Sequence, residues 1–302
     1  MKVLLLGANG QVGTELRKRL AQEQGLELVA ASRTGHLSDG ATGEVADFEA
    51  PESLARLVRA TAPDIVINAA AYTAVDRAET EPDLAFMVNA EAPRVLAEAC
   101  RARDALLVHY STDYVFNGRG KRPYREDDAT DPLGVYGKSK LAGEEAIRLA
   151  GARHLILRTA WVYASHGHNF LRTMLRVGAE RDVLRVVSDQ VGTPTSANLI
   201  ADTTATLIGG PVPEPGTFRL TASGETSWHG FAEAIFAEAT KRGLLAKAPS
   251  VEAISTEDYP TETSRPAYSV LDNTEVSAAT GLVLPEWRAG VADVLGQLAR
   301  VG

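Results

Sequence analysis

A tyrosine and a lysine placed four residues apart are the strongest candidates for chemistry in this chain of 302 residues. Tyr136 and Lys140 stand at i and i+4, so a helix places both side chains on one face. A phenol has an ordinary pKa of about 10, and a nearby ammonium group lowers it. The pair therefore predicts a proton donor to a carbonyl oxygen, with the lysine also able to hold a nicotinamide ribose. A surface pair without catalytic function is the alternative.

A hydroxyl group beyond a buried strand offers a second contact to the same carbonyl. Thr112 closely follows the apolar run 106–110. In an open α/β sheet, residues just past the carboxyl end of a strand face the ligand crevice. We therefore predict that Thr112 donates a hydrogen bond to the carbonyl, and an ordinary turn residue is the alternative.

Three glycines near the N-terminus form the spacing G-x-x-G-x-x-G. Gly7, Gly10 and Gly13 follow the apolar run 2–6 and open an amphipathic segment. Such a turn lets a pyrophosphate approach the backbone, and the helix N-terminus supplies N–H donors and partial positive charge. The spacing predicts dinucleotide binding, against the alternative of a plain strand–helix turn.

The end of the second expected strand indicates which dinucleotide is preferred. Sites for NAD usually carry an acidic residue about 20 residues after the glycines. This chain has Ser32 and Arg33 there, which can hydrogen-bond and pair with a 2′-phosphate. We therefore predict that NADPH is preferred and that NADH remains usable. A solvated loop arginine is the alternative.

Two further stretches fit the path of the cofactor. Asp47 and Phe48 follow a strand-like run and are candidates to hold the adenine. The stretch 68–73 ends another strand with small side chains, as close approach of a dinucleotide requires; its candidates are Ala70, Ala71, Tyr72 and Thr73. Plain packing is the alternative for both stretches.

Alternating strands and helices must position these residues. Apolar strand patterns occupy 2–6, 27–32, 64–68, 106–110 and 154–159, and helical patterns occupy 11–23, 51–61, 84–103 and 136–150. Strands rich in Val, Ile and Leu that alternate with helices predict an α/β fold with a doubly wound, Rossmann-type parallel sheet.

Beyond residue 160 the alternation loosens. Helical patterns cover 169–180, 196–208, 228–242 and about 285–300, with a short strand at 183–187 and a cap predicted at Ser227. We predict a dinucleotide-binding domain over 1–160 and a smaller C-terminal substrate lobe over 161–302. Whether some elements of this second part return to the sheet stays open.

Composition excludes several classes of protein. Apolar residues make up 45% and charged residues 23%, as in ordinary globular proteins, and no apolar run approaches the length of a membrane span. The net charge of −8 and the lack of a basic block disfavour nucleic-acid binding. A single cysteine, and an N-terminus without signal-peptide features, predict a cytoplasmic protein without a multi-cysteine metal site.

Combined in this order, the motifs resemble the extended short-chain dehydrogenase/reductases, and within them the dTDP-4-dehydrorhamnose reductase family. The likeness covers almost the whole chain. The segments that carry it read GANGQVG (7–13), NAAAYTAVDRAE (68–79), HYSTDYVF (109–116), YGKSKLAGE (136–144), RTAWVY (158–163) and SRP (264–266).

The resemblance implies a role for each matching residue. Tyr136 would be the proton donor, with Lys140 and Thr112 completing the catalytic set, while Asp113 and Trp161 would contact the sugar, the indole by stacking. Asn89 would be the structural asparagine of the superfamily. The cofactor would be lined by Gly10, Gln11, Val12, Asp47, Phe48, Ala71, Tyr72 and Thr73. The family is also linked to Mg²⁺ and to homodimers, but the sequence places no metal site.

A dTDP-sugar carries a diphosphate, so a chain with net negative charge needs cations close to it. Arg265 is one candidate, and the stretch 192–196 before a helix start is another, each with ordinary loop chemistry as the alternative. The charge-dense run 119–131 is interpreted as a solvated loop, with a substrate lid as the less favoured interpretation. No histidine accompanies a nucleophile motif, which disfavours a hydrolase.

The expected function is NAD(P)H-dependent reduction of the 4-keto group of dTDP-4-dehydro-β-L-rhamnose to dTDP-β-L-rhamnose. The residues alone reach only a nicotinamide-dependent carbonyl reductase, and the sugar comes from the resemblance. The alternatives are a non-catalytic, dinucleotide-binding regulatory subunit resembling methionine adenosyltransferase β, or another sugar-nucleotide reductase or epimerase.

Overall fold

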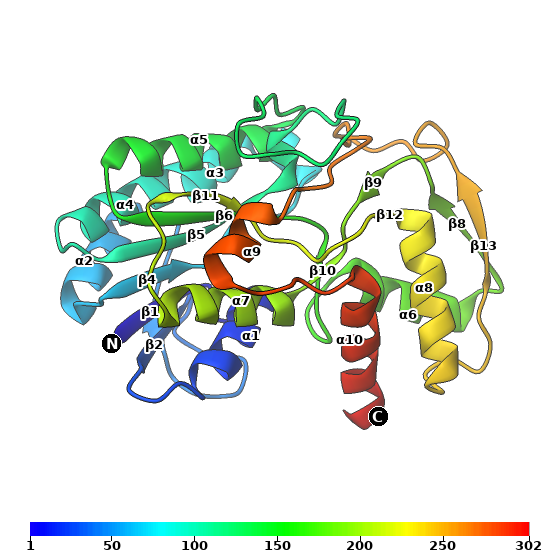
Figure 1. Cartoon of the computed structure of the whole chain (residues 1–302), viewed down its shortest axis with the longest axis horizontal. Coiled ribbons are helices and arrows are strands. Elements are labelled where there is room, and N and C mark those ends of the chain that lie inside the picture. Colours follow the sequence, from blue (N-terminus) through cyan, green and yellow to red (C-terminus); the bar gives the residue numbers. More distant parts are fainter. Residues whose placement is uncertain (302) are drawn as a thin grey trace.

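Seven parallel strands form the central sheet of the chain, whose structure is a computed structural model that describes residues 1–301. Their order is β11-β6-β5-β4-β1-β2-β3 (Figure 1). This order confirms the predicted doubly wound parallel sheet. The strands are β1 (Lys2–Leu6), β2 (Glu27–Ser32), β3 (Glu44–Val45), β4 (Ile65–Asn68), β5 (Leu106–Thr112), β6 (His154–Thr159) and β11 (Gly216–Arg219).

The inner strands of the sheet send alternate side chains into two separate cores. In β1, Val3 and Leu5 join one core and Leu4 and Leu6 join the other, and all four are fully buried. This is why the strands consist of continuous apolar runs. Helices α1 (Gln11–Leu20), α7 (Ala197–Gly209) and α9 (Thr274–Thr280) cover the first face, and α2 (Pro51–Thr61), α4 (Ala92–Arg101) and α5 (Val135–Ala150) cover the second.

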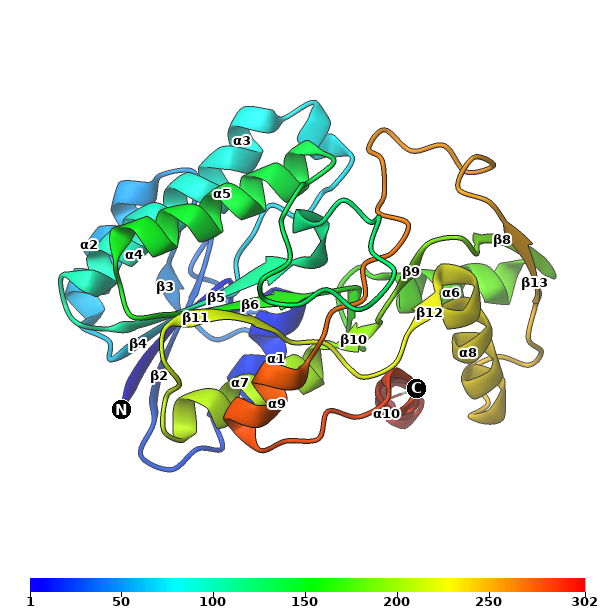
Figure 2. The same cartoon turned by 45° about the horizontal axis from the view of Figure 1, so that its top comes forward.

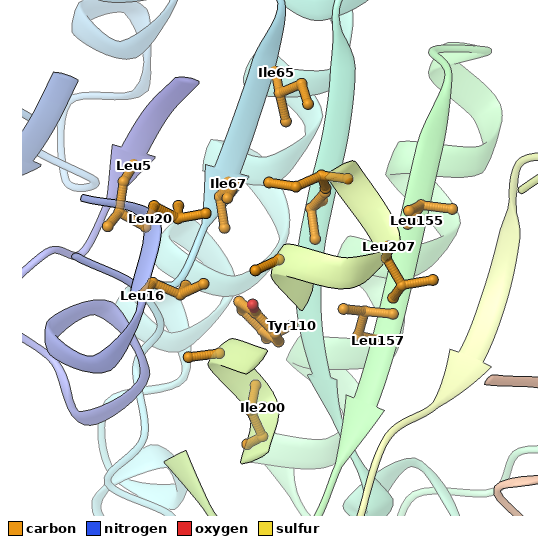
Figure 3. Packing of buried hydrophobic residues seen from close by; sticks show 14 of the residues in the cluster. Leu5, Leu16, Leu20, Ile65, Ile67, Tyr110, Leu155, Leu157, Ile200 and Leu207 are labelled. Carbon is orange, nitrogen blue, oxygen red and sulfur yellow. The ribbon is translucent and has the colours of Figure 1, made fainter. Parts of the chain in front are cut away.

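Figure 3 shows how the first of these cores is filled. Leu16 and Leu20 of α1, and Ile200 and Leu207 of α7, pack over the sheet beside side chains of β1, β4, β5 and β6. Strand β11 comes from the second half of the chain and pairs with β6 at the edge of the sheet. The sheet is therefore completed by residues that lie well beyond the first 160.

The long helix expected over 84–103 is interrupted. The structure has a short helix α3 (Pro82–Phe86), one π-helical turn (Met87–Glu91) and then α4. The turn brings the backbone of Asn89 against α5, where a Cβ at Gly143 would lie 2.0 Å from the Asn89 carbonyl oxygen. The continuous helical pattern of the sequence did not predict this interruption, although π-helical turns mostly occur as such single insertions within α-helices.

A smaller lobe lies beyond the carboxyl ends of the sheet strands (Figures 1 and 2). It contains α6 (Phe170–Glu180), α8 (Trp228–Lys241), α10 (Trp287–Val301) and the parallel pair β8 (Val183–Val187) and β13 (Ser250–Ile254). Two short pairs join β7 (Val162–Tyr163) to β10 (Thr195–Ser196) and β9 (Val191–Gly192) to β12 (Thr226–Ser227). Ser227 caps α8 as predicted, accepting the Gly230 N–H at 3.1 Å.

The charge-dense run 119–131 is largely exposed, as the interpretation as a solvated loop requires, but it is anchored to the rest of the chain by two residues. Tyr124 is buried and stacks on Phe116 with ring centroids 4.1 Å apart. Glu126 pairs at 2.8 Å with the fully buried Arg219 of β11. These contacts explain the charge density, since one of the acidic groups neutralises a cation inside the protein. Within residues 1–301, no helix has both the length and the apolar character needed to cross a membrane.

Candidate active site

The predicted chemical groups gather at the carboxyl edge of the sheet. Gly7 follows β1, Asn68 ends β4 and Thr112 ends β5, and these three strands are neighbours in the order β5-β4-β1. Helix α5 begins at Val135 and brings Tyr136 in its first turn to the end of β5. This edge is where ligands bind in open α/β sheets.

The glycine turn leaves no room for side chains. Gly7 has φ +74°, and a Cβ there would lie 2.6 Å from the backbone nitrogen of Ala70. A Cβ at Gly13 would lie 2.1 Å from the Gly7 carbonyl oxygen, so only glycine allows α1 to pack this closely on β1. The first turn of α1, which includes Gln11 and Val12, has no acidic residue and no side-chain cap. Its N–H groups are therefore suited to an anion, as the pyrophosphate of a dinucleotide requires.

The two residues predicted to select the cofactor differ in their surroundings. The Ser32 hydroxyl is buried and donates to the His36 carbonyl at 2.9 Å, so its one proton is already used. Arg33 is exposed and makes no ion pair within the described residues. Asn9, which the sequence did not indicate, ties the glycine turn to the same loop by donating to the His36 carbonyl at 2.8 Å. Arg33 is therefore better placed than Ser32 to meet a 2′-phosphate.

The stretches expected along the cofactor are partly structural. Phe48 is buried in the core under α2, and Asp47 accepts the Glu49 N–H at 2.9 Å. Ala70 and Ala71 stay partly exposed between β4 and Tyr72, whereas Thr73 is exposed. The side chain of Asn89 brackets the Tyr72 backbone, accepting its N–H at 2.9 Å and donating to its carbonyl at 3.0 Å.

The buried Asn89 also reaches the catalytic helix. Its amide donates to Ser139 of α5 at 3.0 Å. The segment that follows β4 is therefore fixed relative to Tyr136 and Lys140 by one side chain, in agreement with the structural role that the resemblance implies for Asn89.

Thr112 and Tyr136 meet as predicted, whereas Lys140 points elsewhere. The Thr112 side chain lies beside the Tyr136 phenol and acts to lower its pKa. Its hydroxyl also donates to Asp113 at 3.0 Å. Lys140 is buried, donates to the Tyr110 carbonyl at 2.6 Å and lies 3.2 Å from Nε2 of His109.

The expectation that Lys140 lowers the pKa of Tyr136 is wrong for this structure. Burial raises the pKa of Tyr136 to about 12, and the Thr112 side chain offsets only part of that rise. Burial also lowers the pKa of Lys140 to about 8. The physical reason is that Nζ is directed at the backbone of β5 and not at the phenol. A phenol with a raised pKa is fully protonated at neutral pH, which is the form that a proton donor needs.

Asp113 offers an open acceptor beside this pair. Burial raises its pKa to about 6. Its Oδ1 accepts from Thr112, and the buried Ser269 side chain also approaches the carboxylate and acts to lower its pKa. The buried Oδ2 accepts no hydrogen bond of good geometry from the described residues. Such an unsatisfied carboxylate oxygen is suited to a hydroxyl group of a ligand.

Trp161 does not present an open face. Its φ is +46°, a strained value for a bulky residue, and its ring stacks on Trp228 at 3.6 Å with an interplanar angle of 6°. A Cβ at Gly192 would lie 2.6 Å from its Cε2, so the Gly192 backbone covers the indole as well. A sugar that stacks on Trp161 would have to take the place of Trp228, a residue that sequence reasoning missed.

Arg265 lies next to the chemical centre. It pairs with Asp76 at 2.7 Å, and its guanidinium lies 5.9 Å from the ring centre of Tyr114, which in turn packs edge-on against Tyr136 at 5.6 Å. Its Nη1 is buried without a hydrogen-bond partner in residues 1–301. The Arg265 guanidinium therefore lies near Tyr136, with Tyr114 between them, and its Nη1 is available to donate to a ligand.

The stretch 192–196, a candidate contact to the diphosphate, uses its hydroxyl groups within the chain. Thr193 and Thr195 are buried and bond backbone carbonyl groups, and Ser196 caps α7. Their hydroxyl groups are used within the chain and do not favour contact with a nucleotide.

The described residues also contain no group of three or more His, Cys, Asp or Glu side chains that could hold a metal ion. The described residues therefore form no site that would hold a metal ion by protein ligands alone.

The family is decided by comparison with known proteins. The family model described as RmlD substrate binding domain matches residues 1–300. The chain belongs to this family. Its relatives include the dTDP-4-dehydrorhamnose reductases of Escherichia coli K12, 44% identical over 99% of this chain and 98% of that protein, and of Burkholderia thailandensis, 45% identical over 98% and 100%.

Solved structures of the RmlD family superpose closely on this chain. A dTDP-4-dehydrorhamnose reductase from Clostridium acetobutylicum matches with a TM-score of 0.89 and 36% identity, covering 99% of both chains. One from Bacillus anthracis, in complex with NADP, matches with 0.88 and 32%, covering 98% of this chain and 99% of that one. The UDP-glucose 4-epimerase of Thermus thermophilus, at 22% identity and a TM-score of 0.78, shares the fold alone.

Proposed function

We propose that this chain reduces the 4-keto group of dTDP-4-dehydro-β-L-rhamnose to give dTDP-β-L-rhamnose, with NADPH as reductant. The observation that carries the proposal is the contact between Thr112 and a protonated Tyr136 at the end of β5, beside a glycine turn shaped for a dinucleotide. The names of relatives at 44–45% identity over the whole chain support the same reaction.

The chain's own groups have distinct parts in this reaction. When bound, the cofactor supplies a hydride to C4 of the sugar. Tyr136 donates its phenolic proton to the carbonyl oxygen, and Thr112 orients that oxygen by a hydrogen bond. Because burial keeps the phenol protonated, the donor is ready at neutral pH. Lys140 holds the nicotinamide ribose, and the glycine turn with the N-terminus of α1 binds the pyrophosphate.

Two further groups would hold the sugar nucleotide. The free Oδ2 of Asp113 accepts a sugar hydroxyl group, and Arg265 directs its unused Nη1 to the diphosphate. Trp161 contacts the sugar after Trp228 has moved from its face. The boundary expected at residue 160 is moved by the structure, since β11 belongs to the sheet and α7 and α9 cover it. A cofactor domain of residues 1–160 with these three elements, and a substrate lobe formed by the rest of 161–302, are part of this proposal, as are a cytoplasmic location and a homodimer.

The test is a direct assay. Mixing the purified chain with NADPH and dTDP-4-dehydrorhamnose should consume the absorbance band of the reduced nicotinamide and yield dTDP-rhamnose. Turnover only with another keto-sugar nucleotide would identify a different reductase. Cofactor binding without turnover of any such sugar would favour the non-catalytic subunit and contradict the proposal.

The preference for NADPH is tested at Arg33. Replacing Arg33 by Ala removes the cation that would pair with the 2′-phosphate, and such charge-assisted bonds contribute about 1.5–3 kcal/mol. We expect the affinity for NADPH to fall roughly 10- to 100-fold and the affinity for NADH to change little. Titration of cofactor fluorescence measures both constants.

Arg59→Ala is the matched control, because Arg59 is an exposed arginine on α2. It should leave both affinities unchanged. If the native chain binds NADH and NADPH equally and Arg33→Ala alters neither constant, the predicted preference is wrong.

A further inference from the structure

A histidine that has no part in the proposed reaction lies against Lys140. His109 of β5 is fully buried, and its Nε2 is 3.2 Å from Nζ of Lys140. Its Nδ1 is 3.0 Å from the amide nitrogen of Asn68, which is also buried. Asn68 in turn accepts the N–H of Ala70 at 3.1 Å. Two buried side chains, His109 and Asn68, therefore connect Lys140 to the segment that follows β4.

The backbone N–H of Ala70 fixes which atom donates and which accepts in every hydrogen bond from Ala70 to Lys140. The backbone N–H of Ala70 can only donate, so the Asn68 oxygen faces Ala70 and the Asn68 NH₂ group faces His109. Nδ1 of His109 must then accept. A neutral imidazole carries one proton, which therefore sits on Nε2 and points at Lys140.

The proton on Nε2 of His109 determines whether the ammonium form or the neutral amine of Lys140 can form a hydrogen bond with it. An ammonium group has three donors and no acceptor, so a charged Lys140 would set two donors against each other. A neutral amine accepts from Nε2–H of His109 and still donates to the Tyr110 carbonyl at 2.6 Å. Since buried polar groups are nearly always paired, the geometry favours the neutral amine.

The surrounding groups determine at which pH the neutral amine is populated. Burial lowers the pKa of Lys140 to about 8, although the carboxylate of Glu144 acts in the opposite direction, so the neutral form predominates above that pH. That carboxylate is itself paired with Arg158 of β6. Burial holds the pKa of His109 well below its usual value, so the imidazole stays neutral whichever form Lys140 takes. The remaining titratable neighbour, the Tyr110 phenol, bonds Thr204 in the other core at 2.7 Å.

We propose that His109 is a positioning residue for the reduction: it donates from Nε2 to Lys140 and stabilises the neutral amine in the cofactor-free chain. The proposal rests on the proposed function in that Lys140 acts there on the cofactor. An anionic dinucleotide favours the ammonium form. At a pH above the pKa of Lys140 in the free chain, Lys140 therefore takes up a proton when the cofactor binds.

The tautomer of His109 can be observed directly. Nitrogen NMR of the unaltered, cofactor-free chain labelled with ¹⁵N-histidine, one pH unit above the pKa of Lys140, should show a neutral imidazole protonated on Nε2. The signal is assigned by its loss in His109→Gln. A proton on Nδ1, or an imidazolium, would overturn the proposal. This readout requires no reductase activity, so it separates failure of the proposal from failure of the proposed function.

A variant tests the effect on Lys140. Phenylalanine at position 109 fills the site but cannot stabilise the neutral amine, so the pKa of Lys140 in His109→Phe should rise by about one unit. NMR titration of ¹³C-labelled lysine side chains measures it. Calorimetry of NADPH binding in two buffers of different ionisation enthalpy should show less proton uptake than in the native chain.

His154→Phe is the matched control, because His154 is buried on the neighbouring β6 and bonds only the Ala152 carbonyl at 2.8 Å. It should leave the titration of Lys140 unchanged. A pKa of Lys140 that stays the same or falls in His109→Phe would refute the role of His109, and the NMR of the native chain decides the matter if that variant does not fold.

Discussion

Replacing Tyr136 by phenylalanine should reduce kcat for the keto-sugar by roughly 10²- to 10⁴-fold, the range that general acid catalysis contributes. The change removes the phenolic oxygen that would protonate the carbonyl and keeps the ring, which packs edge-on against Tyr114 at 5.6 Å. The fold and the glycine turn are untouched, so the affinity for NADPH should change less than about threefold. Steady-state kinetics and cofactor titration measure the two effects separately.

The control deletes a different phenolic oxygen. Tyr110 lies on β5, and its hydroxyl bonds Thr204 in the core on the other face of the sheet. Tyr110→Phe keeps the backbone carbonyl that accepts from Lys140, and it should retain turnover within a few-fold. Near-native turnover in Tyr136→Phe would refute the assignment of Tyr136 as the proton donor.

The largest loss of stability is expected from Arg158→Met. Glu144 is fully buried and receives two bonds from Arg158, at 2.8 and 2.6 Å, and one from Ser111 at 2.6 Å. Removing the cation leaves a buried carboxylate with much weaker compensation, which costs about 3–5 kcal/mol. Urea denaturation at neutral pH measures the difference in the free energy of unfolding.

The pH dependence of this loss has a definite sign. Burial acts to raise the pKa of Glu144, but the hydrogen bonds from Arg158 and Ser111 and the charge of Arg158 lower it by more. The pKa of Glu144 in the folded chain therefore lies below its ordinary value. In the native chain this group therefore stabilises the fold above its unfolded pKa, and the contribution is lost as the pH falls. Without Arg158, burial raises the pKa of Glu144 in the folded chain above its unfolded value. The folded variant is then most stable at low pH, where Glu144 is protonated, and it loses stability as the pH rises. The difference between variant and native chain should shrink in acid.

Two controls separate the charge from the volume of the side chain. Arg148 also contacts Glu144, at 3.3 Å, but is exposed, so Arg148→Met should cost less than about 1 kcal/mol. The double change Arg158→Met with Glu144→Met removes both buried charges and should recover much of the lost stability. Equal losses at neutral and acid pH, or a double variant as unstable as the single one, would show that the buried charge is not the cause.

The sheet and its covering helices could be predicted because their signal is local. Apolar runs such as 2–6 must be buried on both faces, and the helical spacing between them leaves few arrangements. The same reasoning placed Thr112 and Tyr136 together, since the carboxyl ends of neighbouring strands share one edge.

The details that the sequence did not predict depend on partners far away along the chain. Lys140 meets His109 and the Tyr110 carbonyl instead of the phenol, and Trp161 is stacked on Trp228. Spacing shows which face of a helix a side chain occupies but not which distant backbone group it reaches. One signal was available, however: His109 interrupts an otherwise apolar buried strand, and such a residue requires partners.

The late arrival of β11 affects how the chain folds during synthesis. Its residues, 216–219, pair with β6 some 60 positions earlier, and α7 and α9 supply much of one core. A nascent chain that ends near residue 160 exposes an unpaired strand edge and an uncovered apolar surface, both of which favour aggregation. Such long-range closure is slow compared with helix formation. We therefore expect the cofactor-binding half to complete its folding on the ribosome only after β11, α7 and α9 have been synthesised.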